Sequence, residues 1–180
     1  MNQELPTRPP GQSALEIELG RVLIEFSLLE QELDVFLSSI VGRPRDMGMF
    51  LRPILCEMSV SSKINALAEV FFLRSQSAEN QARLTDDDRE EYRKRLAKLL
   101  KRVDAANSKR NELVHSNWTL PNSYSREHTL IKWPRRRNTP GVFYAGNVSA
   151  LQIRQVVESI QGIRNDLKSF RNALGDQRLL

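Results

Sequence analysis

The sequence has little of what several protein classes require. Its single cysteine, Cys56, excludes an internal disulfide, and its two histidines, His115 and His128, do not make a zinc-ligand set. No hydrophobic run approaches the roughly 20 residues of a membrane-spanning helix, and the first residues lack a signal-peptide pattern. Phosphate loops of the G-x-x-x-x-G-K-[ST] type and G-x-S-x-G nucleophile elbows are also missing. We therefore expect a cytoplasmic protein that needs no membrane, metal or cofactor, and we expect Cys56 to be a buried small hydrophobic residue.

The residues that are present are typical of one globular domain. The chain has 180 residues, of which 40% are hydrophobic and 27% charged. Its net charge is +5, and residues 121–148 supply most of it. This region holds five basic residues and one acid, Glu127; the basic residues are Arg126, Lys132, Arg135, Arg136 and Arg137. An uneven charge of this kind indicates a local surface for an anionic partner.

The first long segment shows the clearest helical pattern. Residues 1–12 hold three prolines and no periodicity, so we expect a flexible arm, and Ser13 with Glu16 predicts a capping box that begins a helix. Apolar residues then follow in alternating steps of four and three: Leu15, Leu19, Val22, Phe26, Leu29, Leu33, Phe36 and Ile40. A second apolar row, Ile17, Ile24, Leu28 and Val35, predicts that this helix is buried from more than one direction.

Further helices are expected over residues 46–58, 60–75, 86–116 and from Ser149 to the C-terminus. Pro53 interrupts the first of these, Thr85 is the expected N-cap of the third, and Ser149 with Gln152 forms a second capping box. Residues 127–134 and 141–147 alternate in the manner of strands, which favours a β-hairpin or a structured loop. The predicted fold is all-α: an up-down bundle of four main helices plus a short one, with an insert at about 119–148 in a single domain of residues 13–180.

One helix carries polar residues on its apolar side. The stripe Tyr92, Leu96, Leu99, Val103 and Ala106 leads by the same spacing to Arg110. Asn107 and Asn111 lie beside Arg110, and Asn111 is one helical turn before His115. An unpaired buried arginine costs on the order of several kcal/mol, so a partner must compensate for it. In a purely structural interpretation, Glu25 or Glu30 of the first helix pairs with Arg110, and His115 caps the helix end.

The segment Arg110-Asn111-x-x-x-His115 near the end of a long helix resembles the HEPN superfamily. The signature of that family is an arginine, four to six residues and a histidine, often with a polar residue directly after the arginine. The long first helix with Leu29 and Glu30 also looks like the opening helix of such proteins. The resemblance covers roughly residues 13–175, and it carries a short motif whose helical context adds to its specificity.

The resemblance implies a metal-independent endoribonuclease with no cofactor. Family members are usually homodimers, are often found in toxin–antitoxin or anti-phage systems, and have a composite site to which both protomers contribute. By this resemblance His115 is the general acid or base, Arg110 neutralises charge on the phosphorane, and Asn111 orients the phosphate or His115. The implied partners are an RNA, with tRNA among the candidates, a second copy of the chain, and an antitoxin or regulatory protein.

The chain departs from one family pattern. Toxins paired with a nucleotidyltransferase antitoxin carry a tyrosine two residues after the histidine, where this chain has Asn117. Control by tyrosine modification in that pattern is therefore in doubt. Many superfamily members also lack nuclease activity, so the alternative is a non-catalytic helical module that binds a protein, a nucleotide or RNA.

A basic loop is the second candidate for contact with RNA. Lys132, Trp133, Arg135, Arg136 and Arg137 combine phosphate-binding cations with an aromatic ring that can stack on a base. The alternative is a solvated hairpin tip packed by its aromatic residues, because charge runs usually mark solvated surface.

Overall fold

The structure is a computed structural model that describes residues 10–41, 47–119, 128–132 and 144–176. Its elements follow one another in chain order. The helices are α1 (Pro10–Val41), α2 (Met47–Glu57), α3 (Val60–Ser75), α4 (Ala78–Gln81), α5 (Asp86–Val114) and α6 (Ala150–Asp176). The strands are β1 (Asn117–Thr119), β2 (His128–Lys132) and β3 (Tyr144–Val148). No helix within these ranges is long and apolar enough to cross a membrane.

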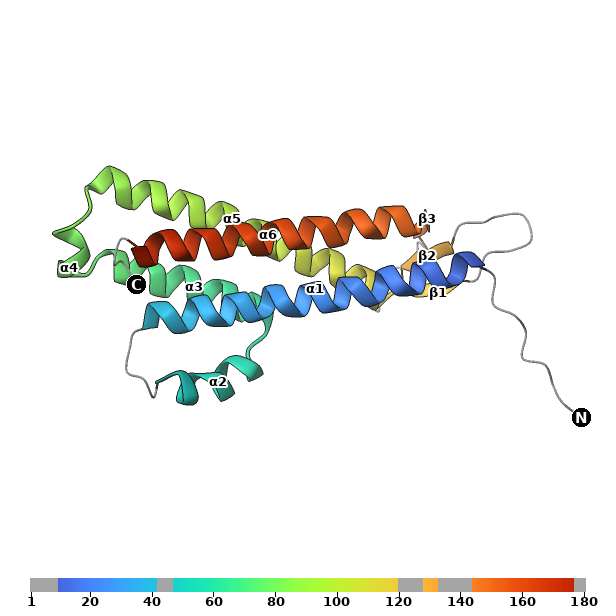
Figure 1. Cartoon of the computed structure of the whole chain (residues 1–180), viewed down its shortest axis with the longest axis horizontal. Coiled ribbons are helices and arrows are strands. Elements are labelled where there is room, and N and C mark those ends of the chain that lie inside the picture. The colour runs from blue at the N-terminus through green and yellow to red at the C-terminus, as the bar shows by residue number, and fades with distance from the viewer. Residues whose placement is uncertain (1–9, 42–46, 120–127, 133–143, 177–180) are drawn as a thin grey trace, which may run out of the picture.

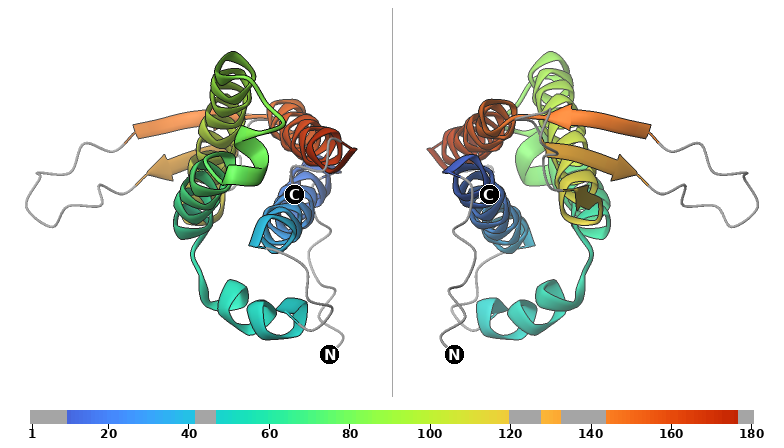
Figure 2. Two further views of the ribbon diagram at one scale, coloured as in Figure 1. Left: turned by 90° about the vertical axis from the view of Figure 1, so that its left-hand side faces the viewer. Right: turned by 90° about the vertical axis from the view of Figure 1, so that its right-hand side faces the viewer.

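Four helices form the predicted bundle. Helix α1 packs against α3, α5 and α6, and α5 packs against both α3 and α6. Figure 1 shows α1, α3 and α6 running in one direction and α5 in the other, while α2 leads the chain back between α1 and α3. Seen along the bundle in Figure 2, α2 lies outside the four packed helices. The helical bundle expected from the sequence is therefore confirmed.

Helix α3 is short compared with its neighbours. It has 16 residues, whereas α1 has 32, α5 has 29 and α6 has 27. It lies beside the half of the bundle next to α4, and α1, α5 and α6 continue without it toward the strands (Figure 1). Arg110 and His115 belong to this second half, where α5 ends and β1 begins.

The sequence predicted capping residues at the start of three helices, and two of these three predictions are confirmed. Thr85 accepts a hydrogen bond from the backbone N–H of Asp88, and Asp88 accepts one from the backbone N–H of Thr85, which completes a capping box. Ser149 and Gln152 make the matching pair before α6. The prediction for α1 was wrong, because the helix begins at Pro10 rather than at Ser13. Proline is favoured in the first helical turn, since it lacks an N–H that would go unpaired there.

The predicted seam of α1 is buried in the core, but the second apolar row of this helix is exposed. Val22, Leu29, Leu33 and Phe36 have no exposed surface. Residues of the second row lie on the opposite side of α1, and Ile17 and Ile24 are each 62% exposed. Burial of α1 from a second direction was therefore a wrong prediction for the described residues of a single chain. Only one side of the helix meets α3, α5 and α6.

Cys56 is also not where the sequence placed it. It lies in α2, which continues through Pro53 without the break that the sequence led us to expect, and its side chain is exposed. The reason is the position of α2, which touches the bundle through α1 and buries Leu55 (Figure 2).

Ion pairs join α1 to α6 along their length. The Glu18 carboxylate, 4% exposed, accepts hydrogen bonds from Arg154 of α6 and from Arg21 of its own helix. Further along, Glu25 pairs with Arg164 at 2.9 Å, and Glu32 pairs with Arg171 at 2.7 Å. The three acids repeat every seven residues, so they lie along one edge of α1.

The three strands form a small antiparallel sheet in the order β1–β2–β3. Trp118 lies opposite Leu130, and Leu130 lies opposite Gly146. In Figure 2, β2 and β3 point away from the bundle on the side of α5. The turn of the expected hairpin falls on residues 133–143, outside the described ranges, so the hairpin insert stays a prediction.

Candidate functional site

The candidate site lies on the last two turns of α5, and Arg110 is its central residue. Its side chain is half-buried and continues the buried row Leu99, Val103 and Ala106, as the spacing predicted. The guanidinium carbon lies 5.8 Å from the centre of the Phe26 ring of α1. Phe26 is itself buried, so the cation is held against an aromatic face that is shielded from water.

Three polar side chains of α5 form a short hydrogen-bonded chain. Arg110 Nη1 donates to Asn111 Oδ1 at 2.9 Å, and Asn111 Nδ2 donates to Asn107 Oδ1 at 3.4 Å. The first bond is well formed, while the second is long for an amide pair. Asn111 therefore holds the guanidinium of Arg110, whereas the role implied by the resemblance, which is to orient the phosphate or His115, stays a prediction.

Among the residues that the structure describes, Arg110 has no carboxylate partner of the kind that the structural interpretation required. Glu25 bonds to Arg164 and Gln161, and Glu30 bonds to Lys63. Both expected partners are thus occupied elsewhere, and pairing of Arg110 with either of them was a wrong prediction. The Nε atom of Arg110 is buried and has no hydrogen-bond partner among the described residues. A buried donor without a partner is costly, and a bound ligand, a water molecule or another chain can supply the missing acceptor.

His115 lies at the end of α5, apart from Arg110. It is the C-cap residue, its backbone N–H donates to Asn111 O at 3.0 Å, and its side chain is exposed. Five residues on an α-helix correspond to about 140° of rotation, so the two side chains leave α5 in different directions. Within the described part of the chain, no hydrogen bond joins the His115 ring to Arg110 or Asn111. The structure thus brings Arg110 and Asn111 together and leaves His115 open to solvent.

The chain that follows His115 is held close to the helix end. Trp118 Nε1 donates to Leu113 O at 2.9 Å, and Ser116 Oγ bonds to Glu112 O. These bonds satisfy two carbonyls at the end of α5 that have no partner in the helix. They also fix the start of β1 beside His115, so the exposed imidazole sits on a rigid corner between a helix and a sheet.

The predicted RNA-contacting loop can be placed only in part. Lys132 is the last residue of β2, while Trp133, Arg135, Arg136 and Arg137 lie outside the described residues. Their role stays a prediction. Among the described residues, no three His, Cys, Asp or Glu side chains are grouped so that they could hold a metal ion.

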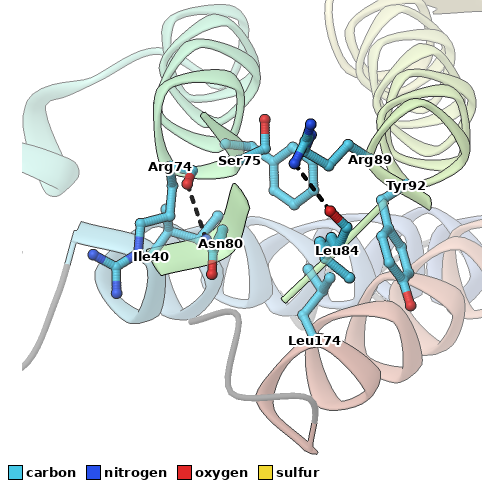
Figure 3. A pocket seen from close by; sticks show the side chains of 9 residues that line it. Ile40, Arg74, Ser75, Asn80, Leu84, Arg89, Tyr92 and Leu174 are labelled. Atoms are coloured by element: carbon cyan, nitrogen blue, oxygen red, sulfur yellow. Dashed lines mark hydrogen bonds between the residues drawn. The ribbon is translucent and has the colours of Figure 1, made fainter. Parts of the chain in front are cut away.

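A small space lies at the far end of the bundle, where α3, α4 and α5 meet α1 and α6. Figure 3 shows it beside Arg74, Asn80 and Tyr92, with Asn80 Nδ2 donating to Arg74 O at 2.9 Å. Its volume is about 10 Å³, which is enough for one water molecule. This space is too small for a substrate, so it is not a rival to the α5 site.

Sequence reasoning also missed a buried charge on α3. Lys63 of α3 is 2% exposed, and its Nζ lies 2.9 Å from Glu30 and 2.8 Å from Asp34, both on α1. Burial would lower the pKa of Lys63, but the contacts with Asp34 and Glu30 outweigh it, and the pKa is raised. The signal was present in the spacing, because Lys63 is one turn before Leu67 and two turns before Phe71.

Comparisons of the chain with models of protein families, with characterised proteins and with solved structures find no match. The case for a function therefore rests on the residues of this chain, above all on Arg110 and the groups around it.

Proposed function

We propose that the protein is a metal-independent endoribonuclease of HEPN type that cleaves RNA at Arg110, Asn111 and His115. The observation that carries the proposal is the buried Nε of Arg110, which has no partner among the described residues although its guanidinium is held by Asn111 and Phe26. A phosphate oxygen is the acceptor that best suits an arginine fork of this kind. The exposed imidazole of His115 supplies a side chain that can accept or donate a proton in the reaction.

The proposed reaction is transesterification within the RNA. The 2′-oxygen attacks the adjacent phosphorus, the bond from phosphorus to the 5′-oxygen breaks, and the products are a 2′,3′-cyclic phosphate and a 5′-hydroxyl. The proton lost by the 2′-hydroxyl and the proton gained by the 5′-oxygen balance, and His115 takes part in one of these transfers. Arg110 stabilises the negative charge that builds up on the phosphorane oxygens.

A second copy of the chain completes the proposed site. Arg110 and His115 leave α5 in different directions within one chain, so one protomer does not bring both groups to one phosphate. Two protomers that meet at the ends of α5 would place the histidine of one beside the arginine of the other. We further propose that residues 119–148 fold as a hairpin insert, which carries Trp133 and the arginines 135–137 toward the same RNA.

Cleavage of total RNA and tRNA in EDTA tests the proposal. The wild-type chain is compared with His115→Ala and with His128→Ala, which removes the other histidine as a matched control. We expect cleavage by wild type and His128→Ala, products with 2′,3′-cyclic phosphate ends, and loss of at least about a hundredfold in His115→Ala. Equal rates for the two histidine variants would refute the role of His115 in proton transfer. A reaction that stops in EDTA would refute a metal-independent mechanism.

The second candidate is a non-catalytic helical module that binds a partner. The observation that favours it is the solvent exposure of His115 and its lack of contact with Arg110 in one protomer. In that case Arg110 would be a structural residue anchored on Phe26. If the protein is such a module, we expect that it cleaves no RNA. We also expect that Arg110→Ala lowers its thermal stability.

A further inference from the structure

A groove of about 350 Å³ runs between α5 and α6, on a different side of α5 from Asn111 and His115. Arg102 and Lys109 of α5 form one wall, and Gln155 and Ser159 of α6 contribute uncharged polar groups to the other. None of the described residues that line the groove is an acid. Its lining is therefore cationic and neutral, which suits an anion.

The cationic wall continues along α5 beyond the groove. Arg95, Lys98, Arg102 and Lys109 share one side of the helix, because their steps of three, four and seven residues match its turns. This side of α5 lies toward α6, because the guanidinium carbon of Arg95 is 5.4 Å from the centre of the Phe170 ring of α6. From Arg95 to Lys109 the row spans about 21 Å, at 1.5 Å per residue. This length is enough to follow several successive phosphates.

The charges of this row are only partly neutralised. Arg102 pairs with Asp166 at 2.6 Å, and Lys109 approaches Glu112 at 3.3 Å. Lys98 and Arg95 make no ion pair within the described part of the chain, and both are exposed. The row thus keeps free positive charge beside neutral hydrogen-bonding groups.

We propose that the α5/α6 groove and its cationic wall bind the phosphate backbone of single-stranded RNA, as a contact separate from Arg110 and His115. The choice of RNA as the anion rests on the proposed function. The groove floor argues against an acidic helix as occupant, because Ile160 and Ile163 are already 1% and 3% exposed and offer little apolar surface to cover. Point cations at intervals with uncharged donors between them match a sugar–phosphate backbone instead.

RNA binding by a cleavage-free chain tests the groove. A labelled single-stranded RNA is titrated with His115→Ala protein, and fluorescence anisotropy gives Kd at several NaCl concentrations. The test variant adds Lys98→Gln and Lys109→Gln, both at exposed positions. The matched control adds Arg52→Gln and Lys168→Gln, which remove the same charge from exposed residues that belong neither to the groove nor to the cationic row of α5. Arg102 is left unchanged, because its loss would also break the pair with Asp166.

We expect the groove variant to lower the slope of log K against log salt by about 1.4, which corresponds to about 25-fold weaker binding at 0.1 M salt. The control should lose at most about threefold, since charges more than about 10 Å from the RNA are screened there. Equal losses in the two variants would overturn the proposal, as would undetectable RNA binding at low salt. Binding of poly-glutamate as tight as that of RNA would overturn the choice of RNA.

The binding and cleavage measurements test the groove and the ribonuclease separately. If wild type cleaves RNA but the groove and control variants bind like the parent, the groove proposal is wrong and the ribonuclease stands. If the groove variant alone loses RNA binding and wild type cleaves nothing, the groove stands and the ribonuclease is wrong.

Discussion

The ammonium group of Lys63 on α3 lies 2.9 Å from a carboxylate oxygen of Glu30 on α1, and the lysine side chain is 2% exposed. Asp34 adds a second acid at 2.8 Å, one turn further along α1. The contact with Asp34 is an ion pair rather than an aligned hydrogen bond, because Oδ1 has no hydrogen-bond partner. This buried cation joins α3 to α1 near the start of α3, where the bundle changes from four helices to three (Figure 1).

Lys63→Met should destabilise the protein although it keeps the apolar length of the side chain. Breaking a buried ion pair costs about 3–5 kcal/mol, and partial exposure of Glu30 and Asp34 reduces the expected loss to about 2 kcal/mol. Urea unfolding measures it. The triple variant with Glu30→Gln and Asp34→Asn should recover most of the loss, because no carboxylate is then left without its partner. A single variant as stable as wild type would mean that the three groups do not interact.

The ion pairs of Lys63 also predict how the free energy of unfolding changes with pH in the alkaline range. The pKa of Lys63 is raised above its ordinary value of 10.5, so the folded state holds the proton more tightly than the unfolded state. The stabilisation is therefore complete below about pH 10 and is lost as the pH rises through the folded pKa. The difference in unfolding free energy between wild type and Lys63→Met should be constant from pH 7 to 9 and shrink above that range. A difference that grows with pH would contradict this assignment.

Thr85→Ala should lower the free energy of unfolding by about 1 kcal/mol, which is the usual loss on removing an N-cap side chain.

Hydrogen bonds from the Thr85 hydroxyl and from its backbone N–H lower the pKa of Asp88. This contribution is present above the ordinary Asp value and is lost as the pH falls through the lowered one. Thermal unfolding from pH 7 to 2 should therefore bring wild type and Asp88→Ala together at the acid end. Asp87→Ala is the control, because Asp87 lies in the same turn without being the box residue.

Glu18→Gln should destabilise the contact between α1 and α6. The carboxylate is 4% exposed and accepts bonds from Arg154 Nε at 3.0 Å and from Arg21. A hydrogen bond to a charged group contributes about 1.5–3 kcal/mol, and the exposure of both arginines places the expected loss near 1.5 kcal/mol. Chemical denaturation of Glu18→Gln beside Glu158→Gln, an exposed acid on α6, measures it. Equal midpoints for the two variants would contradict a stabilising role of this pair.

Two substitutions on α1 test which of its sides is buried in solution. Phe36 has no exposed surface and meets the Phe170 ring edge-on with centroids 6.1 Å apart, so Phe36→Ala should cost about 3–5 kcal/mol. Ile24 on the outer row is 62% exposed, so Ile24→Ala should change stability by about 0.5 kcal/mol or less. Unfolding at two protein concentrations measures both. A large, concentration-dependent loss for Ile24→Ala would show that the outer row is covered by another chain.

Much of the helical architecture could be read from local pattern. The alternating steps of the core row on α1 and the capping residues Thr85 and Ser149 appear as the sequence indicated. The break expected at Pro53 does not, because α2 continues through it. The start of α1 was misplaced, because Ser13 has the chemistry of a cap while Pro10 is equally suited to open a helix. The candidate site was predictable to the extent that Arg110 interrupts an apolar row and Asn111 lies next to it. The structural interpretation also placed His115 at the helix end, where it is the C-cap residue. The sequence could not give the direction of its side chain, because that depends on the chain that follows the last helical turn.

The sequence by itself determined which residues form helices, which side of each helix is apolar, and that an arginine occupies a buried row. These properties depend on residues within a few turns of one another, so periodicity and capping chemistry record them. Only the tertiary structure decided which charges meet: Glu25 binds Arg164, Glu30 binds Lys63, and Arg110 is left with Asn111 and Phe26. It also decided that the outer row of α1 faces solvent in this chain. The reason is that periodicity fixes the sides of a helix, whereas the choice of helix that packs on each side depends on contacts between residues far apart in the sequence.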